Sequence, residues 1–256
     1  MVLFSTGPAL SQTLFEHFLC GDCLRNQLVF IGALRYKKTG GPMKKIDFMI
    51  FDFDGTLVDT GADLVKSINY TLGTLGLPER PAHEIISFVG DGVNKLMEKS
   101  LGKDHAGRHA DAMKIFTDYY AEHLMDHTVL YPGVREILEN YRNKTKMILT
   151  NKRHRFTMRI AESLKIEKYF ADIIGADSMP FMKPDQRVMD HIFSKYPSAK
   201  GSAVVIGDGV NDVLIARKTG VLSCALLNGL GNRDELLKLR ADYYCEDILE
   251  LKDLFE

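Results

Sequence analysis

The stretch IDFMIFDFDGTLVDT, residues 46–60, places two carboxylates directly after an almost unbroken apolar run. The run from Phe48 to Phe53 is short for a helix and too apolar for a strand with one face in water, so it predicts a strand covered on both faces. Asp52 and Asp54 then leave the sheet at the carboxyl end of this strand, where ligands of open α/β sheets bind. The stretch therefore predicts a buried strand that ends in a site.

The two acids also have an ordinary explanation. Taken alone, an Asp-x-Asp pair is more often a turn or a helix cap than a site. Here the pair follows an apolar strand, where loss of hydration disfavours unpaired charge. A hard cation bound by the carboxylate oxygens relieves that cost. Gly55 lets the backbone turn sharply behind the pair. We therefore expect Asp52 and Asp54 to belong to a metal site.

The composition limits the classes of protein to which the chain can belong. The chain has 256 residues, 45% hydrophobic and 26% charged, with a formal net charge of -1, which is typical of a soluble globular protein. No basic excess suggests nucleic acid, and no apolar stretch approaches the roughly 20 residues of a membrane span. The four cysteines are too few and scattered for a disulfide framework, so a cytoplasmic location is expected. Cys20 and Cys23 have redox-pair or half-zinc-site spacing, without supporting context.

Residues 1–42 differ from the rest of the chain. They contain Gly7-Pro8 and Gly40-Gly41-Pro42 and lack sustained periodicity, which predicts a poorly structured N-terminal extension. An uncharged start with interrupted apolar runs argues against a signal peptide, and acids before the first arginine, Arg25, argue against a mitochondrial presequence. Our hypothesis is that Met43 is the physical start of the protein and that the preceding segment is a loosely attached extension or an artefact. Intact-mass measurement of the natively expressed protein tests it.

The remaining chain alternates strands and helices, with one helical interruption. Residues 61–128 show helical periodicity and contain nothing that reads as a strand. The alternation elsewhere predicts an α/β fold with a Rossmann-like, mainly parallel sheet and right-handed crossovers. We therefore expect a core of residues 43–60 and 129–256 with an all-helical cap domain, 61–128, lying over the site as a lid. The later strands are expected at 146–150, 172–175, 202–207, 222–227 and 241–244, and the helices of the core at 156–164, 188–196 and 213–219.

Polar signals stand at four strand ends in this order: Asp52-Phe53-Asp54, Thr150-Asn151, Lys183-Pro184 and Gly207-Asp208 with Asp212. Each alone is weak, since Thr-Asn fits a helix cap, Lys-Pro a surface turn and Gly-Asp-Gly a hairpin-like turn. Four such coincidences at the exits of one sheet are a poorer explanation than one shared site. We therefore expect these side chains to converge.

The combination is typical of phosphoryl transfer. Asp52 is predicted to be the nucleophile, and Asp54 to protonate the leaving oxygen and later take a proton from water. Lys183 is predicted to neutralise the phosphate and the nucleophile. Asp208 is predicted to bind Mg²⁺, with Asp212 nearby. The three carboxylates of Asp52, Asp208 and Asp212 and one lysine leave an excess negative charge, which one divalent ion cancels. Without the ion, each close pair of like charges costs about 4 kcal/mol at an effective dielectric of 20. The predicted substrate-binding groups are Thr150, Asn151, Lys183, Gly55 and Lys152.

With these four motifs in order, the chain from Ile46 to about Leu251 resembles the haloacid dehalogenase-like superfamily. The resemblance implies a sheet of strand order 3-2-1-4-5 and a cap of the first type. It also implies an aspartyl-phosphate intermediate on Asp52. The implied Mg²⁺ ligands are the Asp52 side chain, the Asp54 backbone carbonyl and Asp208, with Asp212 in support.

Within the superfamily, Asp54 points to phosphate esters, since dehalogenases and phosphonate hydrolases lack a carboxylate there. The motifs together are similar to phosphoglycolate phosphatases, which implies 2-phosphoglycolate as the small-molecule substrate. Two departures concern Arg153, where a proline commonly stands, and Lys183-Pro-Asp-Gln186 in place of Lys-Pro-x-Pro. Candidates for the substrate's non-reacting end are Gly90–Gly92 with Lys95, and Lys152–Arg155.

Other functions remain open at this point. A pyrophosphatase, a nucleotidase, a sugar-phosphate phosphatase or a phosphomutase of the same fold would keep all four motifs. A non-catalytic binding module is a remote alternative, because such a module is expected to lose catalytic residues and every position discussed is retained. The partner is expected to be a small phosphate ester, with no nucleic acid or membrane involved, and the protein a monomer or homodimer.

Overall fold

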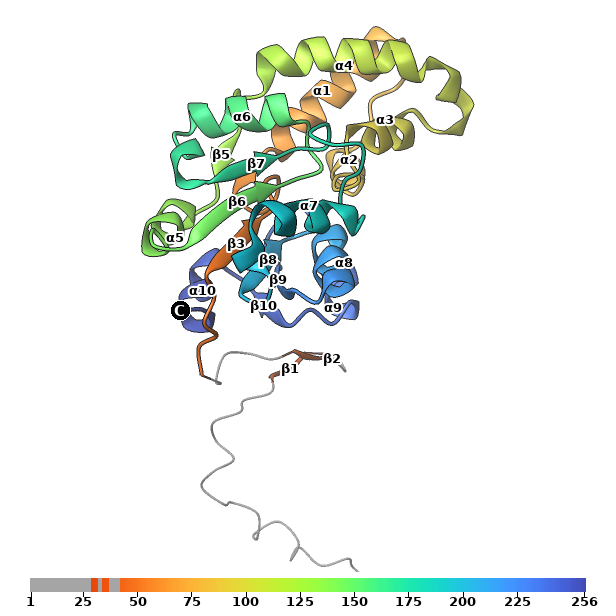
Figure 1. Cartoon of the computed structure of the whole chain (residues 1–256). Coiled ribbons are helices and arrows are strands. Elements are labelled where there is room, and N and C mark those ends of the chain that lie inside the picture. Colours follow the sequence, from red (N-terminus) through yellow and green to blue (C-terminus); the bar gives the residue numbers. More distant parts are fainter. Residues whose placement is uncertain (1–28, 32–33, 37–41) are drawn as a thin grey trace, which may run out of the picture.

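The computed structural model describes residues 29–31, 34–36 and 42–256. Its core is a six-stranded sheet in which all neighbouring strands run parallel (Figure 1). Counted along the chain, these strands have the predicted order 3-2-1-4-5, and the expected edge strand adds a sixth. In spatial order the strands are β7 (Asp172–Ile174), β6 (Thr145–Leu149), β3 (Phe48–Phe51), β8 (Ala203–Gly207), β9 (Leu222–Leu226) and β10 (Tyr243–Cys245).

β3 lies in the middle of the sheet and is buried on both faces, as its apolar sequence predicts. Because side chains alternate along a strand, Met49 and Phe51 join one hydrophobic cluster while Phe48 and Ile50 join another. Helices therefore cover both faces of the sheet (Figure 1). The first cluster includes residues of α5 (Val134–Asn140), α6 (His154–Ser163) and α10 (Leu251–Leu254), and the second includes residues of α7 (Arg187–Lys195) and α8 (Val210–Thr219).

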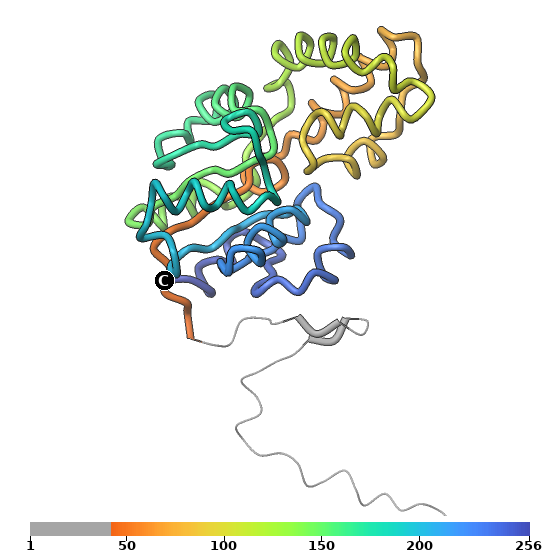
Figure 2. The backbone as a smooth tube through the Cα atoms, turned by 45° about the vertical axis from the view of Figure 1, so that its right-hand side comes forward, coloured from red at the N-terminus to blue at the C-terminus, as the bar shows by residue number. Residues whose placement is uncertain are grey.

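Residues 61–128, here called the helical insert, contain helices and no strand. β4 (Val58–Asp59) and β5 (Val129–Leu130) pair antiparallel at its two ends. Figure 2 shows the insert, coloured orange to yellow-green, as a group of helices beside the core. The insert comprises α1 (Gly61–Thr74), α2 (Ala82–Ile86), α3 (Val93–Leu101), α4 (His109–His123) and a short 3₁₀ helix, η2 (Lys103–Arg108).

Three α-helices of the core were not predicted, α5, α9 (Arg233–Lys238) and α10. They have 7, 6 and 4 residues, too few turns for the apolar spacing to be read from the sequence. β3 ends at Phe51, although the apolar run suggested a strand up to Phe53. Asp52 therefore follows the strand directly. Three one-turn 3₁₀ helices complete the core, η3 (Glu167–Tyr169), η4 (Pro197–Ala199) and η5 (Ile248–Glu250).

The predicted N-terminal extension, residues 1–42, lies largely outside the described residues, as do Cys20 and Cys23. Within it, β1 (Val29–Ile31) and β2 (Leu34–Tyr36) pair antiparallel. In the described part of the chain, no helix combines the length and the apolar character that crossing a membrane requires.

Candidate active site

The acidic loop follows β3 at the carboxyl edge of the sheet. The backbone N–H of Asp52 donates to the carbonyl of Ile206 in β8 over 2.8 Å, which fixes the start of the loop. Gly55 has a φ of +81°, in the left-handed region that favours glycine. A Cβ at Gly55 would lie only 2.0 Å from Oδ2 of Asp208. The turn at Gly55 therefore brings the loop against Asp208 in a way that no other residue permits.

Three carboxylates converge at this edge, from Asp52, Asp208 and Asp212, with one ligand oxygen of each within 4.8 Å of the others. Asp208 is buried and accepts hydrogen bonds from the Thr56 hydroxyl at 2.8 Å and from the backbone N–H groups of residues 230 and 231 at 2.9 and 3.0 Å. Burial and the charge of Asp52 raise the pKa of Asp208 to about 7. The carboxylates predicted from separate motifs thus lie together.

Lys183 lies between two of these acids. Its buried Nζ is 2.6 Å from Oδ1 of Asp212 and 3.0 Å from Oδ1 of Asp52. Burial lowers the pKa of Lys183, but the two carboxylates outweigh burial and raise it above its usual value. Burial and the charge of Asp52 raise the pKa of Asp212 despite this lysine. One lysine therefore does not neutralise the whole cluster.

The cluster fits a divalent cation. Three carboxylates and one lysine leave excess negative charge, and a hard ion such as Mg²⁺ prefers carboxylate and carbonyl oxygens. The side chain of Asp54 does not take part, because its carboxylate turns toward Thr60 and Lys152. Any contribution of Asp54 to a metal is therefore confined to its backbone carbonyl, as the family resemblance implies.

Asp54 is held from two sides. Its Oδ1 accepts a hydrogen bond from the Thr60 hydroxyl at 2.7 Å, and its two oxygens lie 3.1 and 3.3 Å from Nζ of Lys152. The same Nζ donates to the hydroxyl of Tyr120 in α4 over 2.7 Å. Burial lowers the pKa of Lys152, but Asp54 and Tyr120 outweigh it and raise that pKa. Lys152 therefore holds the acid Asp54 as well as lining the site.

Two asparagines connect the core to the insert. The Nδ2 of Asn151 donates to the carbonyls of Gly90 and Lys183, both at 2.9 Å. The Nδ2 of Asn211 donates to the same Gly90 carbonyl at 3.2 Å and to Oδ1 of Asp91 at 3.0 Å. In this structure the amide of Asn151 thus holds a loop of the insert over the predicted phosphate site. Sequence reasoning gave Asn151 no such role and missed Asn211.

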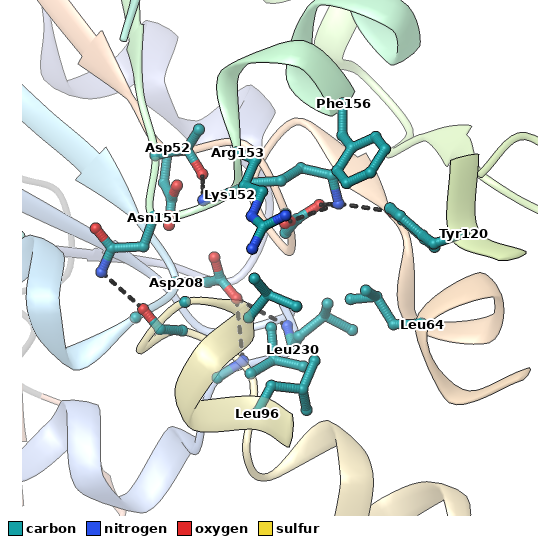
Figure 3. A pocket seen from close by; sticks show the side chains of 18 of the residues that line it. Asp52, Leu64, Leu96, Tyr120, Asn151, Lys152, Arg153, Phe156, Asp208 and Leu230 are labelled. Carbon is teal, nitrogen blue, oxygen red and sulfur yellow. Dashed lines mark hydrogen bonds and ion pairs between the residues drawn. The ribbon is translucent and has the colours of Figure 1, made fainter. Parts of the chain in front are cut away.

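A cavity lies between the core and the insert (Figure 3). Six of the residues predicted to react, bind metal or bind phosphate line it, and so do Gly90, Gly92 and Arg153 among the candidates for the substrate's non-reacting end. Lys95, predicted as a candidate for the substrate's non-reacting end, instead pairs with Glu98 on the surface at 2.7 Å. Three further predicted residues adjoin residues that line the cavity: Gly55 lies against Asp208, Lys183 contacts Asp52, and Asp212 accepts a hydrogen bond from the N–H of Gly209. The six are Asp52, Asp54, Thr150, Asn151, Lys152 and Asp208.

The chain is similar in sequence to proteins of a known family. The model of the family described as haloacid dehalogenase-like hydrolase matches residues 49–226. A phosphoglycolate phosphatase of Chromobacterium violaceum is 35% identical over 224 residues, which cover 84% of this chain and 98% of that protein. One of Vibrio parahaemolyticus is 29% identical over 220 residues, covering 82% and 96%.

Solved structures show the same fold. The structure of a predicted phosphoglycolate phosphatase from Haemophilus somnus 129pt has a TM-score of 0.76 at 24% identity, with 82% of this chain and 98% of that chain covered. A haloacid dehalogenase-like family hydrolase from Streptococcus pneumoniae has a TM-score of 0.73 at 29% identity, covering 81% and 97%.

The chain therefore belongs to the haloacid dehalogenase-like hydrolase family, as its four motifs predicted. It is an enzyme of this family, a hydrolase. The curated relatives named above are, more particularly, phosphoglycolate phosphatases.

Proposed function

We propose that this hydrolase is a Mg²⁺-dependent phosphatase of small phosphate monoesters, with 2-phosphoglycolate as its substrate. The observation that carries the proposal is the position of Asp52, which lies 3.0 Å from Nζ of Lys183 and forms a cluster with Asp208 and Asp212. A carboxylate between a lysine and a metal-binding pair is suited to attack a phosphoryl group. The names of the relatives support 2-phosphoglycolate among the possible esters.

In the proposed reaction, an oxygen of Asp52 forms a bond to phosphorus while the bond from phosphorus to the ester oxygen breaks. Asp54 protonates the departing oxygen. Asp54 then takes a proton from the water that hydrolyses the aspartyl-phosphate and releases phosphate. The contacts of Asp54 with Thr60, at 2.7 Å, and with Lys152, at 3.1 Å, support this role because they fix the direction of its carboxylate.

The proposed phosphate site lies around Asp52. The Thr150 hydroxyl is proposed to bind a phosphoryl oxygen. The Asn151 side chain would join it on leaving the Gly90 carbonyl, to which it donates in this structure. The backbone N–H of Gly55 would join it on leaving the carbonyl of Val58. Lys183 and Lys152 would neutralise charge beside the phosphoryl oxygens. Mg²⁺ would be held by the Asp52 side chain, the Asp54 carbonyl and Asp208, with Asp212 in support. When bound, the ion supplies positive charge to the phosphoryl oxygens.

We further propose that the helical insert, 61–128, is a cap over a core of 43–60 and 129–256. The support is that Tyr120 and the Gly90 carbonyl of the insert contact Lys152 and Asn151 of the core. A closed cap would keep bulk water from the phosphoryl group until hydrolysis. The enzyme is proposed to act in the cytoplasm, as a monomer or homodimer, on a small molecule and on neither nucleic acid nor membrane.

Phosphate release from a substrate panel tests the proposal. The panel contains 2-phosphoglycolate, pyrophosphate, nucleoside monophosphates and sugar phosphates, each with Mg²⁺ and with EDTA. We expect 2-phosphoglycolate among the best substrates, and turnover only with the metal. A preference for pyrophosphate or nucleotides would indicate a different phosphatase of this fold. Isomerisation of sugar phosphates without free phosphate would indicate a phosphomutase, and no turnover at all a binding module.

A further inference from the structure

Arg153 lines the cavity between the core and the insert. It follows Thr150 and Asn151 at the end of β6, and its guanidinium points into the cavity (Figure 3). The cavity also contains the predicted nucleophile, Asp52. A ligand with its phosphate at Asp52 would therefore extend through the space that Arg153 shares.

The other cations near the reacting acids are already paired. Lys183 contacts Asp52 and Asp212, and Lys152 contacts Asp54. Arg153 has a weaker partner, the Thr117 hydroxyl of α4, at 3.5 Å from Nη1. No carboxylate in the described part of the chain lies within ion-pair distance of Arg153. Its positive charge is therefore available to a ligand.

The walls around Arg153 are mostly apolar, which narrows the chemistry of that ligand. They offer few hydrogen-bond donors, so an anionic group deep in the cavity depends on the guanidinium. In apolar surroundings a charged hydrogen bond is stronger than in water, and the planar fork of arginine matches a carboxylate in a bidentate manner. The apolar side chains are Leu64, Val93, Leu96, Phe116, Phe156 and Leu230.

We infer that Arg153 is a specificity residue that binds the carboxylate at the non-reacting end of the phosphate ester. The inference rests on the proposed function and adds to it the group that separates a carboxylated substrate from a neutral one. Because the phosphatases that the chain resembles commonly have a proline at this position, the contact would be particular to this chain. A proline would leave the cavity without this cation.

The test compares two esters of similar size, 2-phosphoglycolate and 2-hydroxyethyl phosphate, which lacks the carboxylate. In Arg153→Ala we expect kcat/KM for 2-phosphoglycolate to fall about 10- to 100-fold, mostly through KM, the range for a lost charged hydrogen bond. For 2-hydroxyethyl phosphate we expect a change below about 3-fold. Arg153→Lys keeps the charge without the fork and should lose an intermediate amount on 2-phosphoglycolate alone.

Arg155→Ala is the matched control. The sequence made Arg155 a candidate for the substrate's non-reacting end, but in the structure it is exposed and does not line the cavity. It packs over the Phe156 ring at 4.6 Å from the ring centroid. We expect both esters to be turned over as by the wild type. Equal losses on the two esters in Arg153→Ala and Arg153→Lys, or no loss on either, overturn the inference.

The failure of the inference is distinct from that of the proposed function. If the wild type hydrolyses both esters with equal kcat/KM, Arg153 does not recognise a carboxylate and phosphatase chemistry stands. If the wild type hydrolyses neither ester with Mg²⁺, both fail.

Discussion

The proposed reaction gives Asp54 two opposing roles, first as an acid and then as a base. Its carboxylate lies 3.1 Å from Nζ of Lys152, and the second half of the proposed reaction requires that carboxylate to take a proton from water. The first half requires the protonated form, so the requirement for an acid depends on how much the departing oxygen needs a proton. Leaving groups of different basicity therefore separate the acid role of Asp54 from a structural one.

Replacing Asp54 by asparagine tests that role. We expect Asp54→Asn to lower kcat for an alkyl phosphate by about 10²–10⁴, the range for acid-base assistance. The loss should be smaller for p-nitrophenyl phosphate, whose leaving group departs without a proton. Steady-state kinetics on both esters check this, and Asp52→Asn, which removes the nucleophile, should abolish both activities. Equal losses on the two esters in Asp54→Asn would contradict the acid role.

Gly55 makes a second prediction at the residue scale. In Gly55→Ala the new Cβ would meet Oδ2 of Asp208 at 2.0 Å, at a φ of +81° that alanine resists. We expect a lower unfolding temperature together with a raised Mg²⁺ requirement for turnover, since Asp208 must move. The control is Gly73→Ala in α1, where a Cβ meets nothing within 4 Å. That variant should gain up to about 1 kcal/mol from helix propensity and keep its Mg²⁺ requirement.

At the scale of elements, the sequence predicts the strands that consist of short apolar runs. β3, β6 and β8 are short apolar runs that end in polar residues, so both their existence and the position of the site at their ends could be read. The contact of Tyr120 with Lys152 could not. It joins residues 32 positions apart across the insert and core, and Tyr120 also fits the apolar face of α4 beside Phe116. Only the orientation of the insert reveals its hydroxyl as part of the site.

Tyr120 therefore gives a prediction about α4. In Tyr120→Phe, Lys152 loses its partner in the insert and keeps Asp54, so we expect kcat to fall about 2- to 10-fold, in line with one hydrogen bond of about 1 kcal/mol. Tyr119→Phe is the control in the same helix, because the Tyr119 ring stacks on Tyr70 at 3.8 Å between centroids, away from the cavity. Kinetics of both variants on 2-phosphoglycolate check this. A similar loss in Tyr119→Phe would show that the effect comes from α4 packing.

Arg153 shows a different limit of the sequence. Its departure from the usual proline is visible in the chain, but only the structure shows its guanidinium in the cavity. Residue type and strand position thus predict the reacting groups, which follow the ends of apolar strands. The groups that choose the substrate come from side-chain directions at the boundary between insert and core, and no local pattern encodes those directions.

For the molecule as a whole, the cluster of carboxylates lowers the stability of the folded state. Asp52, Asp208 and Asp212 lie together at the sheet edge, and burial with the charge of Asp52 raises the pKa of Asp208 to about 7. A carboxylate held in this way destabilises the folded chain unless a cation is bound. Metal binding and unfolding are therefore expected to be linked, because an ion that binds only the folded state adds about 2.7 kcal/mol at a hundred times its Kd.

Thermal unfolding of the wild type and of Asp208→Asn tests this linkage without an activity measurement. The wild type should unfold at a higher temperature as Mg²⁺ is added, and Asp208→Asn should not. In EDTA, Asp208→Asn should be at least as stable as the wild type. Its amide oxygen can still accept from the backbone of residues 230 and 231, while one of the repelling charges is gone. Asp118→Asn, an exposed acid of α4, is the control and should keep the full Mg²⁺ response. If Asp208→Asn unfolded at a higher temperature as Mg²⁺ was added, the metal would bind elsewhere.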